Sequence, residues 1–205
     1  MLSKINRKDC LDKYQVFPQR TYNNALDEEE FVYPKTFKSY ILTLLSKSFK
    51  GHIKMLGVEI MNLLQYLQED ALLFLGDTNM PWLHQNNDYK PVRAAYEYFT
   101  NNKVGNRFNG TLVVNASELP TFITHLAWLT RCNAAMHYIY FSNSRQTILG
   151  NICQYGNLHL DTLTEQADTE FKTFMRSSLF EYGNLHSCNN QFGRTSAIYG
   201  RRITI

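Results

Sequence analysis

The sequence lacks the closely spaced motifs by which many enzymes and metal sites are identified. Its cysteines lie far apart and form no CxxC pair, and its histidines form no HExxH or HxH motif. No GxSxG, P-loop or GxGxxG sequence occurs either. A zinc or iron site would have to assemble entirely through the fold, so we expect no metal and no other cofactor. The cysteines are Cys10, Cys132, Cys153 and Cys188.

Charge and long apolar runs are also scarce. Charged residues make up 19% of the chain and the formal net charge is +3, which is too small to argue for a nucleic-acid partner by itself. The start of the chain has no continuous apolar segment of a signal peptide, and no stretch approaches the roughly 20 apolar residues that span a bilayer. We therefore expect a cytoplasmic protein with reduced thiols and no membrane contact.

Aromatic residues, in contrast, are abundant. Hydrophobic residues make up 44% of the 205 positions, and the chain contains 13 Tyr and 13 Phe. That length fits one domain with a sizeable core. Tyrosine supplies a large contact area at low entropic cost and keeps a polar end, so its excess favours recognition of a partner, although much of it must be core.

The spacing of apolar residues predicts a single α+β domain over residues 1–205, in which 1–30 form a loosely structured lead-in. Because helices and antiparallel hairpins mix without a regular βαβ rhythm, we expect N-terminal helices packed on a mainly antiparallel sheet with C-terminal hairpins. Helices are predicted over 34–49, 57–69, 91–101, 117–133 and 165–180, and strands over 71–75, 103–108, 111–114, 136–141, 146–153, 158–163 and 197–205.

One hexapeptide occurs twice. Residues 154–159 read QYGNLH, and 27 positions later residues 181–186 read EYGNLH. Gly and Asn tolerate positive φ, so both copies can be ordinary turns. Each copy also holds a phenol and an imidazole, which suit a partner-binding surface or an acid–base site. The repeat identifies a region of interest and leaves its role open.

We expect the first copy and the acidic run after it to form a protein-binding surface. Exposed aromatic side chains anchor interfaces, and clustered charges fix orientation. The acidic run also fits the solvated face of one helix, and that reading stays open. The expected contacts are Tyr155, His159, Asp161, Glu165 and Asp168, followed by Tyr182 and His186 of the second copy.

Other functions stay open at this level. His159 and His186 occupy equivalent places in the two copies and would share general base and acid work in a metal-independent ribonuclease, which makes nucleic acid the alternative partner. A subunit of a larger assembly would instead bury the tyrosine-rich face permanently. A cysteine nucleophile is not expected, because Cys153 and His159 are about 20 Å apart along a strand unless a tight turn intervenes.

The C-terminal third resembles small bacterial immunity proteins, particularly those of contact-dependent growth inhibition systems. The resemblance rests on the segment MHYIYFSNSRQTILGNICQYGNLHLDTL, with a strand at 138–141, a strand leading into Cys153, and the first YGNLH copy. It implies a non-enzymatic cytoplasmic protein that binds the toxic domain of a cognate toxin, often a nuclease, and blocks it. The chain departs from many nuclease immunity proteins, because those are acidic and this one is net basic.

Overall fold

The structure, a computed structural model, is an α+β fold, as the sequence predicts. It describes all residues except 1, 24, 26, 135, 184–187, 194–196 and 203–205. The strands are β1 (Ser3–Ile5), β2 (Gln19–Asn23), β3 (Glu28–Val32), β4 (Lys38–Thr43), β5 (Ala71–Gly76), β6 (Thr111–Asn115), β7 (Ile139–Asn143), β8 (Ile148–Ile152), β9 (Leu158–Thr162) and β10 (Glu181–Tyr182). The helices are α1 (Arg7–Lys13), α2 (Phe49–Tyr66), α3 (Lys90–Asn101), α4 (Leu119–Cys132) and α5 (Glu165–Met175), and the 3-10 helix η1 (Ala116–Glu118) precedes α4.

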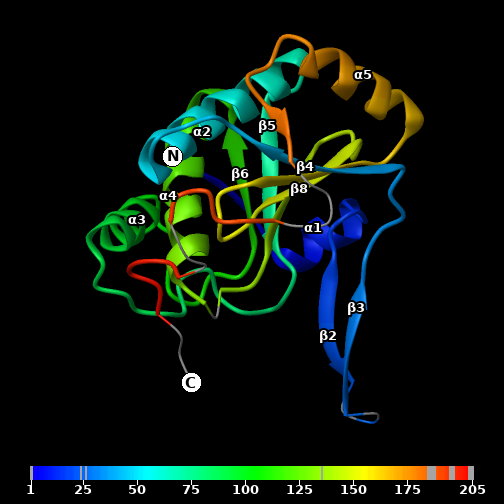
Figure 1. The fold of residues 1–205 in the computed structure, drawn as a ribbon. Coiled ribbons are helices and arrows are strands. Elements are labelled where there is room, and N and C mark those ends of the chain that lie inside the picture. Colours follow the sequence, from blue (N-terminus) through cyan, green and yellow to red (C-terminus); the bar gives the residue numbers. More distant parts are fainter. Residues whose placement is uncertain are drawn as a thin grey trace.

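Eight of these strands form one sheet in the order β1-β6-β5-β7-β8-β9-β4-β10. Every pairing within it is antiparallel. The meander of β7, β8 and β9 confirms the strands predicted in this region. Strands β2 and β3 form a separate hairpin that stands out from the rest of the ribbon (Figure 1).

One face of the sheet is covered by α2 and α4, with α3 packed beside α4 and α5 above β9 (Figure 1). Alternate residues of β5 show how the sheet divides its side chains, since Leu72 and Phe74 pack into the main core under these helices. Gly57 does not interrupt α2. A Cβ at this position would lie 2.7 Å from the Cα of Pro120, so the glycine permits close contact between α2 and α4.

The opposite face is only partly covered. Helix α1 packs there through Cys10 and Tyr14, which contact Leu73 of β5, Tyr140 of β7 and Leu149 of β8 in a second, smaller core. No helix among the described residues lies over the same face of β9 and β4. None of the helices in the described ranges is apolar enough over a sufficient length to cross a membrane.

The predicted helix over 34–49 is wrong. Residues Lys38–Thr43 form β4, and α2 begins only at Phe49. Tyr40, Leu42 and Leu44 are buried at alternate positions, which is the period of a strand. The same short apolar run also fits helical spacing, and pairing with β9 decides between the two.

Other segments also differ from the prediction. The first thirty residues, expected to be a loose lead-in, contain β1, α1, β2 and part of β3. Residues 103–108 form no strand, and α5 ends at Met175 instead of near residue 180. A strand is predicted over 197–205. Among the described residues of this range, the only sheet-like pairing is an isolated bridge between Arg202 and Asn133.

Candidate functional site

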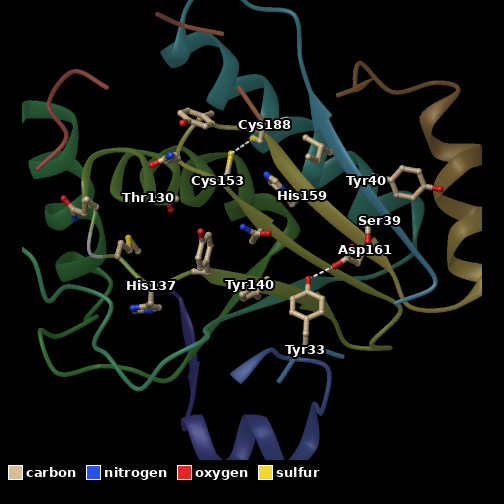
Figure 2. Close-up of a pocket in the computed structure, with 18 of the residues that line it drawn as sticks. Tyr33, Ser39, Tyr40, Thr130, His137, Tyr140, Cys153, His159, Asp161 and Cys188 are labelled. Carbon is tan, nitrogen blue, oxygen red and sulfur yellow. Dashed lines mark hydrogen bonds between the residues drawn. The ribbon is translucent and has the colours of Figure 1, made fainter. Parts of the chain in front are cut away.

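A pocket of about 700 Å³ lies on the half of the sheet that α1 leaves uncovered. Its floor is one row of side chains across four adjacent strands, because the register places Tyr140 opposite Asn151, Asn151 opposite His159, and His159 opposite Ile41. Asp161 lies two residues further along β9 and therefore on the same face. Figure 2 shows His159, Asp161 and Tyr140 in this pocket.

The first hexapeptide forms the turn at one end of the pocket. The amide of Gly156 donates to the carbonyl of Cys153 at 2.9 Å, and Gly156 has a φ of +86°. The Nε2 atom of the buried His52 lies 2.8 Å from the carbonyl oxygen of Gly156 and holds the turn against α2. The turn interpretation is therefore confirmed for this copy. The turn carries Tyr155 to the pocket wall and begins the strand that carries His159.

The described part of the second hexapeptide, residues 181–183, lies on the other side of β4. Glu181 and Tyr182 form β10, which pairs with β4, and the amide of Gly183 donates to the carbonyl of Ile41 at 2.7 Å. His186 falls outside the described residues. Among the residues that the structure describes, the predicted ribonuclease pair is thus represented by His159 alone.

Two cysteines and one histidine meet beside the turn. The sulfurs of Cys153 and Cys188 are 3.3 Å apart, and the ligand atoms of Cys153, His159 and Cys188 all lie within 4.8 Å of one another (Figure 2). The separation of about 20 Å along a strand does not apply to Cys153 and His159, because the tight turn allowed for in that prediction is present and folds β9 back beside β8. The fold therefore assembles a thiol and imidazole cluster that the spacing of the residues does not indicate.

The hydrogen bonds of this cluster shift the pKa values of its two cysteines in opposite directions. The hydrogen bond between the two sulfurs lowers the pKa of Cys188, and contacts from His159 and Asn157 lower that pKa further. The same hydrogen bond, together with burial, raises the pKa of Cys153. The side-chain Nδ2 of Asn157 lies 3.1 Å from the Cys188 sulfur. His159 Nε2 is buried, and no atom of the described residues forms a well-aligned hydrogen bond with it.

A tyrosine and a carboxylate close the other end of the pocket. The hydroxyl of Tyr33, just after β3, donates to a carboxylate oxygen of Asp161 at 2.5 Å (Figure 2). Burial and this hydrogen bond both raise the pKa of Tyr33, so the phenol stays protonated. Tyr33 is 39% exposed and remains accessible at the rim.

The structure brings Tyr155, His159 and Asp161 together and leaves the other predicted contacts outside the pocket. Asp168 is wrong as a surface residue. It is buried, its carboxylate lies 2.6 Å from the Lys172 ammonium, and it accepts a hydrogen bond of 2.5 Å from the hydroxyl of Tyr40. Glu165 is exposed in the first turn of α5, and Tyr182 is 56% exposed on β10, but neither lines the pocket.

Several pocket residues were not identified from the sequence. The sequence predicts Tyr138 and Tyr140 only as strand residues, although their alternation with Ile139 places both on one face. Cys188 and Tyr33 carry no local pattern that points to the pocket. They reach it through the path of the chain, which leads from distant segments to the end of the β8–β9 hairpin and to Asp161.

Comparison with known proteins finds no family model, no curated protein and no solved structure that matches the chain. Function therefore has to be inferred from the site itself.

Proposed function

We propose that this protein is a non-enzymatic binding protein that holds a protein partner against the uncovered half of its sheet. The partner class follows from the resemblance to immunity proteins and is the toxic domain of a contact-dependent growth inhibition toxin, bound in the cytoplasm. The observation that carries the proposal is the pocket of about 700 Å³, whose floor is a row of side chains from four hydrogen-bonded strands.

The side chains around the pocket suit a protein interface. Tyr33, Tyr138 and Tyr155 line it, and Tyr138 is 52% exposed. Tyrosine is enriched among the residues that contribute most to binding, because its ring is large, rigid and able to form a hydrogen bond. The pocket gives a projecting side chain of the partner a place to be desolvated among these rings.

The floor of the pocket is already ordered before binding. His159 and Asn151 lie on strands that are paired on both sides, and Asp161 is held by the hydrogen bond from Tyr33. A partner therefore meets a surface whose backbone does not have to rearrange, which limits the entropic cost of association. Asp161 gives the rim an acidic group, and a basic loop from the substrate cleft of a nuclease is the complementary surface.

The test is direct binding of this protein to the purified toxic domain encoded beside its gene, with that domain inactivated in its own active site. Calorimetry should give a one-to-one complex. Tyr155→Ala and Tyr138→Ala should each weaken it by about 2 kcal/mol or more if these residues are anchors. Tyr66→Ala is the matched control, because Tyr66 is 43% exposed at the end of α2, on the helical side of the sheet.

Two results would contradict the proposed binding surface. One is an affinity that neither pocket variant changes, which would place the binding surface elsewhere. The other is an equal loss of affinity in the Tyr66→Ala control, which would indicate a general loss of folding. Toxin that stays active when saturated with the protein would contradict neutralisation while leaving binding intact.

A further inference from the structure

The cluster of Cys153, His159 and Cys188 has the composition of a metal site. Zinc in proteins takes thiolate and imidazole ligands at about 2.3 and 2.0–2.1 Å in tetrahedral geometry, which places neighbouring ligand atoms roughly 3.6–3.8 Å apart. The two sulfurs here are 3.3 Å apart, and all the ligand atoms lie within 4.8 Å of one another. Tetrahedral geometry therefore needs the sulfurs to separate by about half an ångström and the widest pair of ligand atoms to close by about one ångström.

Hydrogen-bond donors lie around the two sulfurs, as is common around the thiolate ligands of metal ions. Asn157 Nδ2 lies 3.1 Å from the sulfur of Cys188. The backbone amides of Tyr155 and Asn157, in the turn, donate toward the sulfur of Cys153. Such outer hydrogen bonds orient the ligands of metal sites and tune their charge. They come from the first hexapeptide, which gives its turn a chemical role as well as a structural one.

The imidazole is also prepared for a metal. His159 Nε2 is buried and has no well-aligned hydrogen-bond partner among the described residues. A buried polar atom that lacks a well-aligned hydrogen bond costs free energy, and coordination to a metal ion removes that cost. The backbone of His159 is fixed on β9 between Asn151 and Ile41, so the position from which the ring extends is set before the ion binds.

We propose that Cys153, His159 and Cys188 bind one zinc ion at the end of the pocket. A mixed set of thiolates and an imidazole suits zinc better than the hard cations magnesium and calcium. Three protein ligands leave one tetrahedral position, and it opens onto the pocket that all three residues line. A water molecule or a side chain of a bound protein fills that position. The ion also ties residue 188, in the C-terminal segment, to the β8–β9 hairpin.

This site goes beyond the proposed partner binding and is tested without any partner. Protein with its affinity tag removed should carry one zinc per chain, as measured by inductively coupled plasma mass spectrometry. After removal of the metal by a chelator in the presence of a reductant, titration with cobalt(II) should produce the intense absorption of tetrahedral, thiolate-bound cobalt. Cys188→Ser and Cys153→Ser should abolish that spectrum. Cys10→Ala, which removes a thiol on α1, should leave it unchanged.

Two further variants separate ligands from supporting residues. His159→Ala should weaken cobalt binding while both sulfurs remain. Asn157→Ala should keep the tetrahedral spectrum and weaken binding by about 10–100-fold, as expected for an outer-shell residue. Because a variant can fail to fold, the unmodified protein supplies a second measurement. Zinc should protect two of the four cysteines from the thiol reagent DTNB under native conditions.

The outcomes are distinct. An octahedral cobalt spectrum, or zinc content that Cys188→Ser leaves unchanged, would overturn the site. A chain that forms a Cys153–Cys188 disulfide in air, and in its reduced form takes up no zinc, would also overturn it and identify a redox-active pair. Loss of partner binding in Tyr155→Ala with zinc still bound would leave this inference intact.

Discussion

His159 of β9 lies directly opposite Ile41 of β4, and the carbonyl of the same Ile41 accepts a hydrogen bond from Gly183 on its other side. The two copies of the hexapeptide therefore flank one strand. They do different work there, because the first copy makes a turn and enters a central strand, whereas the second begins in the edge strand β10. Similar sequences take different conformations here because their tertiary contacts differ.

The turn in the first copy should depend on Gly156. Its φ is +86°, and a Cβ would lie 2.8 Å from a ring carbon of Phe49. Gly156→Ala should lower the free energy of unfolding by about 1–3 kcal/mol, because it adds backbone strain and a clash. Chemical denaturation followed by tryptophan fluorescence measures this. Gly105→Ala is the control, since a Cβ there meets nothing within 4 Å, and its free energy of unfolding should stay close to that of the wild type. A small change in both variants would contradict the assigned turn.

Local pattern was sufficient to predict much of the site. The alternation of Leu158, His159, Leu160 and Asp161 predicts a strand that sends His159 and Asp161 to the same face, and the structure has them there. The Gly-Asn pair predicts a turn, and one is present. These features depend on neighbours along the chain or on the strand period, which a sequence displays directly.

Contacts between distant segments could not be predicted in the same way. Cys153 meets Cys188 across 35 positions, and Asp168 meets Tyr40 across 128. An acidic residue in the first turn of a helix is typical of a solvated surface, and only the tertiary packing of α5 on β4 and β9 buries this one. The spacing of the cysteines likewise carries no signal, because the path of the chain after α5 decides where Cys188 lies.

Asp168 should make the fold sensitive to acid. Burial favours its neutral form, but hydrogen bonds from Lys172, Tyr40 and Thr162 outweigh this effect and lower its pKa. A carboxyl with a lowered pKa stabilises the fold above its unfolded pKa of about 3.9, and the contribution disappears as the pH falls below that value. Asp168→Asn should be less stable at neutral pH, by about 1–3 kcal/mol. It should also lose less stability than the wild type between about pH 4 and pH 2.

Denaturation at a series of pH values measures the effect. Glu170→Gln is the control, because it makes the same kind of chemical change two residues after Asp168 on the same helix, at a partly exposed position. Parallel stability curves for Asp168→Asn and the wild type across the acidic range would disprove the role given to the buried carboxylate.

His137 should add a second pH dependence in a higher range. Burial, followed by the nearby His84 and Arg7, lowers the pKa of His137 to about 4, and neither ring nitrogen has a hydrogen bond to any of the described residues. The unfolded chain, with a histidine pKa of about 6.5, then binds more protons than the folded one between these values. Stability should therefore rise with pH from about 4 to about 6.5 and then level off.

His137→Phe should remove this rise in stability while keeping a planar ring at the same place. That ring packs directly on Gly76, where an added Cβ would lie 2.2 Å from the imidazole. Thermal unfolding at several pH values checks the prediction. His84→Phe tests whether the neighbour contributes, and it should shift the lower limit of the rise without removing it. A rise of the same size in His137→Phe would mean that another group titrates.

Of two acidic residues near the pocket, Asp161 and Glu165, only Asp161 should affect the affinity for the partner. Asp161 lines the pocket and is held by Tyr33, whereas Glu165 is exposed on α5 outside it. Asp161→Asn and Glu165→Gln each remove one negative charge. We expect Asp161→Asn to weaken binding of the toxic domain by about tenfold or more, because it removes the charge that we propose pairs with a basic loop of the partner. Glu165→Gln should change the affinity little. Calorimetry at low and moderate salt distinguishes the two, and equal losses in both variants would show that net charge, and not the pocket, governs association.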